Sequence, residues 1–131
     1  MKKMILIVKS TYYEDISKEL YENALKNIRK MSYDTYSVPG VFEIPALISK
    51  KIKDYNGVIA LGCVIKGETP HFDFISKATI DGIMKLSIDH QKPIGNGIIT
   101  CLNKKQAIAR SKTKGAEASD AVFKFFQEEI K

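Results

Sequence analysis

Gly57-Val58-Ile59-Ala60-Leu61-Gly62-Cys63-Val64 is the stretch of sequence that decides the fold. It contains no charged residue, and apolar side chains occupy both of its alternating sets of positions. That pattern is typical of a strand buried on both faces, which occurs where helices cover both sides of a parallel sheet. The stretch therefore predicts an α/β protein with this segment as its most buried strand.

Strand-like and helix-like segments alternate on both sides of this stretch. Strands are predicted at 4–10, 33–38, 57–64 and 93–100, and helices at 14–31, 41–53, 69–89, 103–111 and 115–130. Alternation of this kind favours a parallel sheet with right-handed crossovers. The predicted fold class is α/β, namely a flavodoxin-like three-layer sandwich in which a four-stranded parallel sheet has helices on both faces.

Length and composition are those of one ordinary domain. The sequence has 131 residues, of which 44% are hydrophobic and 27% charged, and it contains no repeat or low-complexity stretch. A chain of this length buries enough surface to fold without disulfides or metal. We expect a single domain over residues 1–131, which excludes disordered, collagen-like and repeat proteins.

The excess of positive charge does not indicate a nucleic-acid-binding protein. Lys and Arg total 21 against 15 Asp and Glu, a net charge of +6, but only Arg29 and Arg110 are arginines. Recognition of base edges and phosphates relies on the planar guanidinium, and the lysines are scattered along predicted helices without interleaved aromatics. We expect no nucleic-acid partner, and interpret the lysines as a solvated surface or a weak attraction for anionic substrates.

Few residues are available for a metal site or a membrane segment. Cys63 and Cys101 form no Cys-x-x-Cys pair, and His71 and His90 are the only histidines, so we expect no metal. The apolar run near the amino terminus is cut by a lysine and is short for a signal peptide, and residues 57–65 are too few to span a bilayer. We therefore expect no membrane association and a cytoplasmic protein with reduced thiols.

The candidate site lies where the predicted strands end, because ligands of open α/β sheets bind beyond the carboxyl ends of the strands. The segments delivered there are 10–13, 38–43, 63–71 and 100–103, and they are rich in aromatic and polar residues. They lack the carboxylates of a phosphoacceptor receiver domain, the glycine-rich nucleotide loops, the phosphate loop of flavodoxin and the nucleophile elbow. Those uses of the fold are excluded.

The stretch from Gly67 to His71 carries the clearest sign of chemistry. Thr69 followed by Pro70 predicts an N-cap and the first position of a helix, where free backbone N–H groups can hold an anion. We expect the positive end of the helix dipole to keep the His71 imidazole neutral, and such a group beside an anion can transfer protons. The residues alone equally fit a well-capped helix with a surface histidine.

Aromatic residues in two of these segments indicate a planar ligand. Tyr12, Tyr13 and Phe42 would lie at one edge of the sheet, although any one of them alone would also fit a core position. Glu43 is either a carboxylate that complements a helix dipole or a group that binds hydroxyls. The residues leave these two roles open.

Three blocks of sequence resemble the signature blocks of the lumazine synthase family. They are Val38-Pro39-Gly40-Val41-Phe42-Glu43-Ile44-Pro45, Ala60-Leu61-Gly62-Cys63-Val64-Ile65-Lys66-Gly67-Glu68-Thr69-Pro70-His71-Phe72-Asp73 and Lys114-Gly115-Ala116-Glu117-Ala118. The resemblance spans nearly the whole chain. It implies the family's flavodoxin-like sheet and its reaction in riboflavin biosynthesis. That reaction joins 5-amino-6-ribitylamino-pyrimidinedione to 3,4-dihydroxy-2-butanone 4-phosphate and releases phosphate and water, without cofactor or metal.

The resemblance also implies the roles of individual residues. His71 would be the catalytic proton-transfer residue, Tyr12 would stack on the pyrimidine, and Arg110 of a neighbouring subunit would clamp the phosphate while Lys114 approaches the pyrimidine. Phe42, Glu43 and the backbone before them would hold the ribityl chain, the backbone of 64–65 would meet the edge of the ring, and the backbone N–H groups of 68–69 would meet the phosphate. The implied substrate-binding residues are Tyr12, Tyr13, Gly40, Val41, Phe42, Glu43, Cys63, Val64, Ile65, Glu68, Thr69, Asn96, Arg110 and Lys114.

The sequence departs from the family pattern at a few positions. Asn96 stands where many members carry phenylalanine, Lys66 replaces a common arginine, and Cys63 replaces a common threonine. The segment 111–114 is shorter than the glycine-bearing loop of shell-forming members, and much of their amino-terminal extension is not present. These differences favour a homopentamer, with active sites between adjacent subunits, over an icosahedral shell.

Two other functions compete with this interpretation. One is the archaeal type of riboflavin synthase, which is similar in sequence and consumes lumazine. The other is a non-catalytic flavin or lumazine carrier. A carrier needs no proton-transfer group beside a phosphate site, so the matched His71 and Arg110 argue against it.

Overall fold

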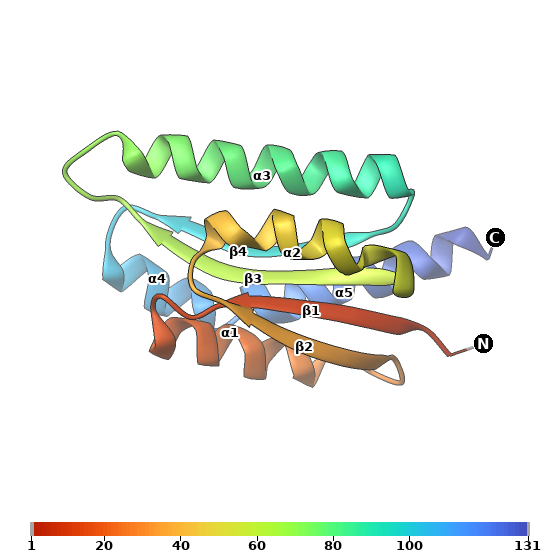
Figure 1. Ribbon diagram of the computed structural model, residues 1–131. Coiled ribbons are helices and arrows are strands. Elements are labelled where there is room, and N and C mark those ends of the chain that lie inside the picture. Colours follow the sequence, from red (N-terminus) through yellow and green to blue (C-terminus); the bar gives the residue numbers. More distant parts are fainter. Residues whose placement is uncertain (1, 131) are drawn as a thin grey trace.

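Residues 2–130, which the computed structural model describes, form a four-stranded parallel sheet with helices on both faces (Figure 1). The strand order is β2-β1-β3-β4. The strands are β1 (Met4–Ser10), β2 (Ser32–Val38), β3 (Gly57–Ile65) and β4 (Ile94–Cys101). The helices are α1 (Glu14–Lys26), α2 (Ile44–Lys51), α3 (His71–His90), α4 (Lys104–Ser111) and α5 (Lys114–Glu129), with short 3-10 helices η1 (Val41–Glu43) and η2 (Ile52–Asp54). The predicted α/β three-layer sandwich is confirmed.

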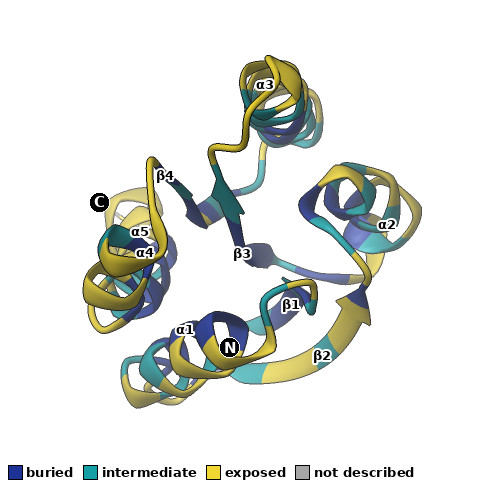
Figure 2. Ribbon diagram, turned by 90° about the vertical axis from the view of Figure 1, so that its left-hand side faces the viewer, coloured by how far each residue is buried: buried dark blue, intermediate teal, exposed yellow. Residues whose placement is uncertain are grey.

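Strand β3 is buried because both of its faces are covered. Ile59 and Leu61 pack into the core beneath α1, α4 and α5, whereas Val58 and Ala60 pack into the core beneath α2 and α3. Successive side chains of a strand point to opposite faces, so one uncharged strand can serve both cores. Figure 2 shows β3 as a buried strand in the middle of the sheet and β2 as a largely exposed strand at its edge.

Helix α5 packs very closely on β4, and glycine makes that approach possible. A Cβ atom at Gly95 would collide with the backbone carbonyl of Ala118 in α5. Gly115, at the start of α5, leaves equally little space against the carbonyl oxygen of Leu20 in α1. These two glycines therefore set how closely the helices of this face approach each other and the sheet.

Two predicted helices are shorter or more broken than their apolar spacing suggests. The helix predicted to reach residue 31 ends at Lys26, because the chain turns through Arg29, whose φ of 56° lies in the left-handed region, to enter β2. The helix predicted over 41–53 is instead a sequence of η1, α2 and η2. The apolar spacing identified the buried faces, whereas the contacts of the folded chain determine where each helix ends.

The start of the third helix also differs from the prediction. α3 begins at His71, and Pro70 occupies the cap position with φ −69° and ψ 3°, so Thr69 is not the N-cap and Pro70 is not the first helical residue. The Thr69 hydroxyl instead accepts a long hydrogen bond from the backbone N–H of His71, at 3.4 Å. A turn before the helix thus takes the place of the expected side-chain cap.

Among residues 2–130, no helix combines the length and the apolar character that crossing a membrane requires.

Candidate active site

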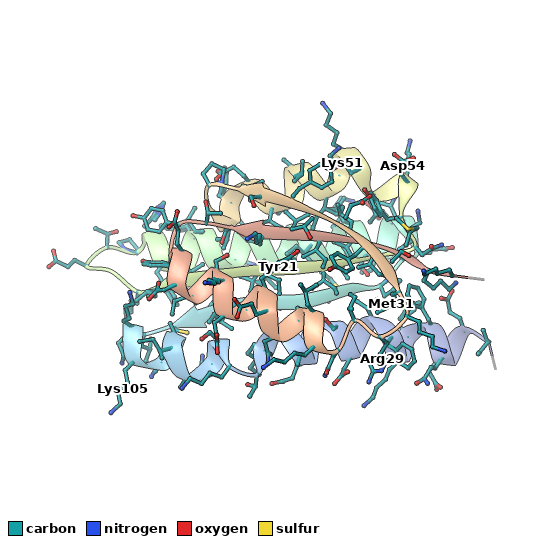
Figure 3. All side chains as sticks on the ribbon, turned by 90° about the horizontal axis from the view of Figure 1, so that it is seen from below. Tyr21, Arg29, Met31, Lys51, Asp54 and Lys105 are labelled. Carbon is teal, nitrogen blue, oxygen red and sulfur yellow. The ribbon has the colours of Figure 1, made fainter. Side chains whose placement is uncertain are left out.

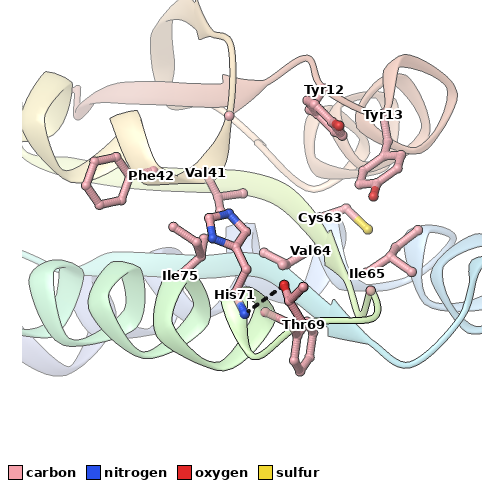
Figure 4. A pocket seen from close by; sticks show the side chains of 13 residues that line it. Tyr12, Tyr13, Val41, Phe42, Cys63, Val64, Ile65, Thr69, His71 and Ile75 are labelled. Atoms are coloured by element: carbon pink, nitrogen blue, oxygen red, sulfur yellow. Dashed lines mark hydrogen bonds between the residues drawn. The ribbon is translucent and has the colours of Figure 1, made fainter.

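A cavity of about 340 Å³ opens beyond the carboxyl ends of the strands, a size that suits a small ligand. Its walls come from the segments that follow β1 and β2, from the end of β3, and from the first turns of α3 (Figure 4). The lining residues are Tyr12, Tyr13, Gly40, Val41, Phe42, Cys63, Val64, Ile65, Gly67, Thr69, His71, Phe72 and Ile75. Most of the residues singled out from the sequence therefore lie together around one cavity.

Tyr12 and Tyr13 form one wall of the cavity. Their rings meet edge to face, with centroids 4.9 Å apart and an interplanar angle of 83°. Tyr13 packs against the core and its carbonyl accepts the N–H of Ser17 in α1, and partial burial, followed by the proximity of Tyr12, raises the pKa of its phenol. Tyr12 is 75% exposed. The anchored ring therefore supports an open ring that is free to stack on a planar ligand.

The turn after β2 is held by its own acidic residue. The backbone N–H of Gly40 donates to Oε1 of Glu43 at 2.9 Å, and a Cβ at Gly40 would lie 3.3 Å from that oxygen. Val41 is buried, while Phe42 is 60% exposed at the cavity. Glu43 does not line the cavity itself, but it fixes the turn that presents Val41 and Phe42. Among residues 2–130, its second carboxylate oxygen accepts no hydrogen bond.

Cys63 contributes a neutral wall. Burial, followed by the influence of Cys101, raises the pKa of its thiol to about 12, and both cysteines are free and buried. A thiol with a raised pKa stays protonated at neutral pH and is a poor nucleophile. We infer that Cys63 shapes the cavity and takes no part in covalent chemistry.

The segment that joins β3 to α3 presents unpaired backbone donors. The N–H of Lys66 donates to the carbonyl of Cys101 at 2.9 Å. Within residues 2–130, the N–H groups of Gly67, Glu68 and Thr69 have no hydrogen-bond acceptor. They stand beside the open start of α3, where an anion is favoured. The arrangement suits a phosphate group.

His71 brings a titratable side chain to the same place. It is exposed in the first turn of α3, and its ring lies in the cavity near Val41 and Ile75 (Figure 4). Cavity, donors and imidazole thus occupy one edge of the sheet. Among the residues described, no group of three or more His, Cys, Asp or Glu side chains is placed to hold a metal ion.

Three predicted residues lie away from this cavity. Arg110 donates from Nη1 to the carbonyl of Thr100 at 3.0 Å, at the end of edge strand β4. Lys114 forms an ion pair with Glu117 at 3.2 Å, and the exposed Asn96 accepts the N–H of Ile98 at 3.0 Å. None of the three lines the cavity of its own chain, and Glu68 contributes no side chain to it either.

Two further lining residues, Phe72 and Ile75, were not among the candidates from the sequence, and Gly67 was singled out there only as part of the stretch that leads into the helix. Ile75 follows His71 by four residues, and side chains with that spacing share a helix face. A helix start assigned at His71 would have placed Ile75 beside it. Phe72 carries no comparable signal, because its place depends on how the loop from β3 turns into α3.

Comparison with known proteins finds the same family by its model and by its individual members. The model of the 6,7-dimethyl-8-ribityllumazine synthase family matches residues 2–129. A protein of that name from Bartonella bacilliformis is 44% identical over 127 residues, which cover 89% of this chain and 84% of the relative. Proteins of the same name from Bartonella tribocorum and Agrobacterium fabrum are 42% identical over 130 residues and 39% identical over 133 residues. These alignments cover 92% of this chain in both cases, and 85% and 90% of the respective relatives.

Proposed function

The chain belongs to the 6,7-dimethyl-8-ribityllumazine synthase family, and we propose that its cavity is the site of that reaction. The chain condenses 5-amino-6-ribitylamino-pyrimidinedione with 3,4-dihydroxy-2-butanone 4-phosphate and releases phosphate in riboflavin biosynthesis. One observation carries the assignment of the site: an exposed aromatic ring, a set of unpaired backbone donors and a histidine meet around a single cavity.

The pyrimidine substrate occupies the side of the cavity next to Tyr12. The 75% exposed Tyr12 ring stacks on the pyrimidine, supported by the anchored ring of Tyr13. The backbone at Val64 and Ile65 faces the polar edge of the heterocycle, and the thiol of Cys63 closes the wall as a neutral group. This side of the site is flat and largely apolar.

The ribityl chain runs toward the turn after β2. Phe42 packs against the chain, and the backbone of Gly40 and Val41 supplies polar contacts. The second carboxylate oxygen of Glu43 accepts a hydrogen bond from a ribityl hydroxyl, while the first accepts the hydrogen bond from the Gly40 N–H. The carboxylate thus has two tasks, since it shapes the turn and binds substrate.

The phosphate substrate lies at the start of α3. Its phosphate accepts hydrogen bonds from the unpaired backbone N–H groups of Glu68 and Thr69. The positive end of the α3 dipole adds to the attraction for the phosphate. His71, the first residue of α3, transfers protons between the two bound substrates as the new bonds form. The cavity also holds the two substrates side by side in a reactive orientation, and this supplies the remaining rate enhancement.

A neighbouring subunit completes the site in a homopentamer. Arg110 and Lys114 lie outside the cavity of their own chain, so the phosphate clamp that the family resemblance assigns to Arg110 comes from another copy. The exposed apolar side chains of α3, Phe74, Met84 and Ile88, support burial against such a copy. A charge-assisted guanidinium contact then completes the phosphate site.

The setting of the reaction is the cytoplasm. Cys63 and Cys101 are free and buried, as is usual for proteins in reducing compartments. The substrates are small molecules, and the macromolecular partner is a second copy of the chain rather than nucleic acid.

A two-substrate assay tests the function directly. We expect phosphate to appear, together with the lumazine chromophore, only when both substrates are present. Conversion of lumazine alone to riboflavin would instead make the chain a riboflavin synthase. Tight binding of lumazine with no turnover of either kind would make it a carrier.

A further inference from the structure

A second cavity lies at the amino ends of the strands, opposite the proposed active site. Its volume is about 600 Å³, within the range of small-molecule sites. Its walls come from the residues before β1, from the turn between α1 and β2, and from α5. The lining residues are Lys2, Lys3, Arg29, Lys30, Met31 and Phe123. Figure 3 shows Arg29 and Met31 at the end of the molecule opposite Lys105.

The charge of this cleft is strongly positive. Four of its six lining side chains are cationic, and the carboxylate of Asp120, 2.9 Å from Nη1 of Arg29, offsets one of them. Lys2 and Lys30 are exposed and take part in no ion pair or hydrogen bond with described residues. Two unpaired cations in a concave site attract an anion more strongly than the same cations on a convex surface, because the walls focus the field.

The cleft also has a rigid apolar side. The guanidinium carbon of Arg29 lies 4.2 Å from the centroid of the Phe123 ring, and its Nη1 donates to the carbonyl of Asn27 at 3.2 Å. Met31 is buried beside them, and Nζ of Lys3 lies 4.8 Å from the centroid of Phe126. These contacts hold in place the Phe123 ring and the planar guanidinium of Arg29, against which a flat group can stack.

We propose that this cleft binds a small phosphate monoester that carries an aromatic ring. The phosphate lies between Lys2 and Lys30, whose ammonium groups have no other partner, and the ring packs against Arg29 and Phe123. The site requires both parts of the ligand, because point charges alone do not use the apolar wall and an uncharged ring does not use the lysines. It is separate from the proposed catalytic cavity and does not depend on the function assigned to it.

Phenyl phosphate is the probe, and methyl-labelled methionine supplies the readout. Met31 lines the cleft, whereas Met84 lies on α3 at the other face of the sheet, away from the cleft, and reports on non-specific effects. We expect phenyl phosphate to shift the NMR signal of the Met31 methyl group saturably and to leave that of Met84 unchanged. Inorganic phosphate and phenol, which each represent half of the probe, should bind at least about tenfold more weakly.

Charge variants test which lysines matter. The double variant Lys2→Gln with Lys30→Gln should weaken phenyl phosphate binding about tenfold or more, since it removes both charge-assisted contacts. The control, Lys50→Gln with Lys105→Gln, removes two exposed charges elsewhere and should bind as the unmodified protein does.

Several outcomes would overturn the proposal. They are an unmoved Met31 signal, equal weakening by both double variants, and affinity for inorganic phosphate or phenol that matches that for phenyl phosphate. All four lysines are exposed and lie outside the core, so each variant should keep the fold, which far-ultraviolet circular dichroism checks.

Discussion

His71 is the residue on which the proposed chemistry depends most directly. A general acid or base usually contributes about 10²–10⁴-fold to turnover, and His71 lies at the cavity without a side-chain partner in the core. We expect His71→Ala to lower kcat by that factor and to leave KM for both substrates nearly unchanged, as steady-state kinetics would measure.

His90 provides the matched control, because it is the other histidine and lies at the opposite end of α3. His90→Ala should leave kcat unchanged. A His71→Ala protein that turns over at the rate of the unmodified protein would remove His71 from the mechanism.

Arg110 should affect one substrate more than the other. Loss of a charge-assisted contact to phosphate costs about 1.5–3 kcal/mol, so Arg110→Ala should raise KM for the phosphate substrate about tenfold or more while KM for the pyrimidine changes little. Arg110→Lys keeps the charge but loses the planar guanidinium. Its KM for the phosphate substrate should therefore lie between those of the unmodified protein and of Arg110→Ala. Equal weakening of both substrates would indicate that Arg110 acts by holding the end of β4 through the Thr100 carbonyl.

The raised pKa of Cys63 links the stability of the protein to alkaline pH. Burial raises the pKa of its thiol to about 12 in the fold, against an ordinary pKa of 9.0. Between these values the unfolded chain loses the proton and the folded chain keeps it, so the free energy of unfolding falls as pH rises from about 9 to 12, by at most about 1.4 kcal/mol per pH unit from this group. The contribution is fully present below pH 9.

Urea titrations at pH 8 and pH 10.5 measure this effect. Cys63→Ala removes the group, so its stability should decline less steeply with pH than that of the unmodified protein, although the cavity left by the substitution lowers its stability at both values. Parallel declines would show that other groups, such as the buried phenol of Tyr55, whose pKa is also raised, account for the alkaline loss.

The contact between α5 and α1 depends on a glycine. A Cβ at Gly115 would collide with the carbonyl oxygen of Leu20, and backbone cannot move aside as a flexible side chain does. We expect Gly115→Ala to lower the free energy of unfolding by about 1–3 kcal/mol, as overpacking does. Gly67→Ala is the control, since a Cβ there meets nothing within 4 Å and its φ is not positive; it should change stability little in the same chemical denaturation experiment.

The sequence was sufficient for the order of the helices and strands and insufficient for their ends. The uncharged run in β3 predicted its double-sided burial correctly, because that pattern follows from covering both faces of the strand. The end of α1 at Lys26 was not predictable from periodicity, since the left-handed turn at Arg29 is held by Asp120 and Phe123, which are distant in sequence. Local patterns identify buried faces, whereas long-range contacts determine boundaries.

The candidate site shows the same division. Tyr12, Phe42 and His71 could be named in advance because each follows a strand or opens a helix at the edge where ligands bind. The sequence could not show that the Glu43 carboxylate accepts a hydrogen bond from the Gly40 N–H, or that Arg110 in α4 donates to the Thr100 carbonyl of β4 in the same chain. Those contacts depend on the conformations of loops, which a pattern of residue types does not specify.

The two ends of the sheet carry different chemistry. At the carboxyl ends, unpaired backbone donors and an imidazole surround the proposed catalytic cavity. At the amino ends, lysines surround a cleft with an aromatic wall. Part of the excess positive charge, a net +6, is therefore gathered at the amino-end cleft. The length of the strands separates the two cavities (Figure 1), so a ligand in one leaves the other free.

A site shared between subunits makes a prediction that one chain alone does not. The cavity draws its residues from the segments after β1, β2 and β3, whereas Arg110 lies at the outer edge beside β4. In a closed ring, each interface would join the His71 side of one copy to the Arg110 side of the next.

His71→Ala and Arg110→Ala proteins, each impaired alone, should therefore rescue one another when they are refolded together. With random mixing in equal amounts, about a quarter of the interfaces combine two intact sides. Assayed at a phosphate-substrate concentration well below KM, where each parent is impaired, activity should return to about a quarter of that of the unmodified protein. Native mass spectrometry of the same sample reports whether mixed rings have formed. If mixed rings form and activity stays at the level of the two parents, the arginine and the histidine serve a site within one chain, and the shared-site proposal is wrong.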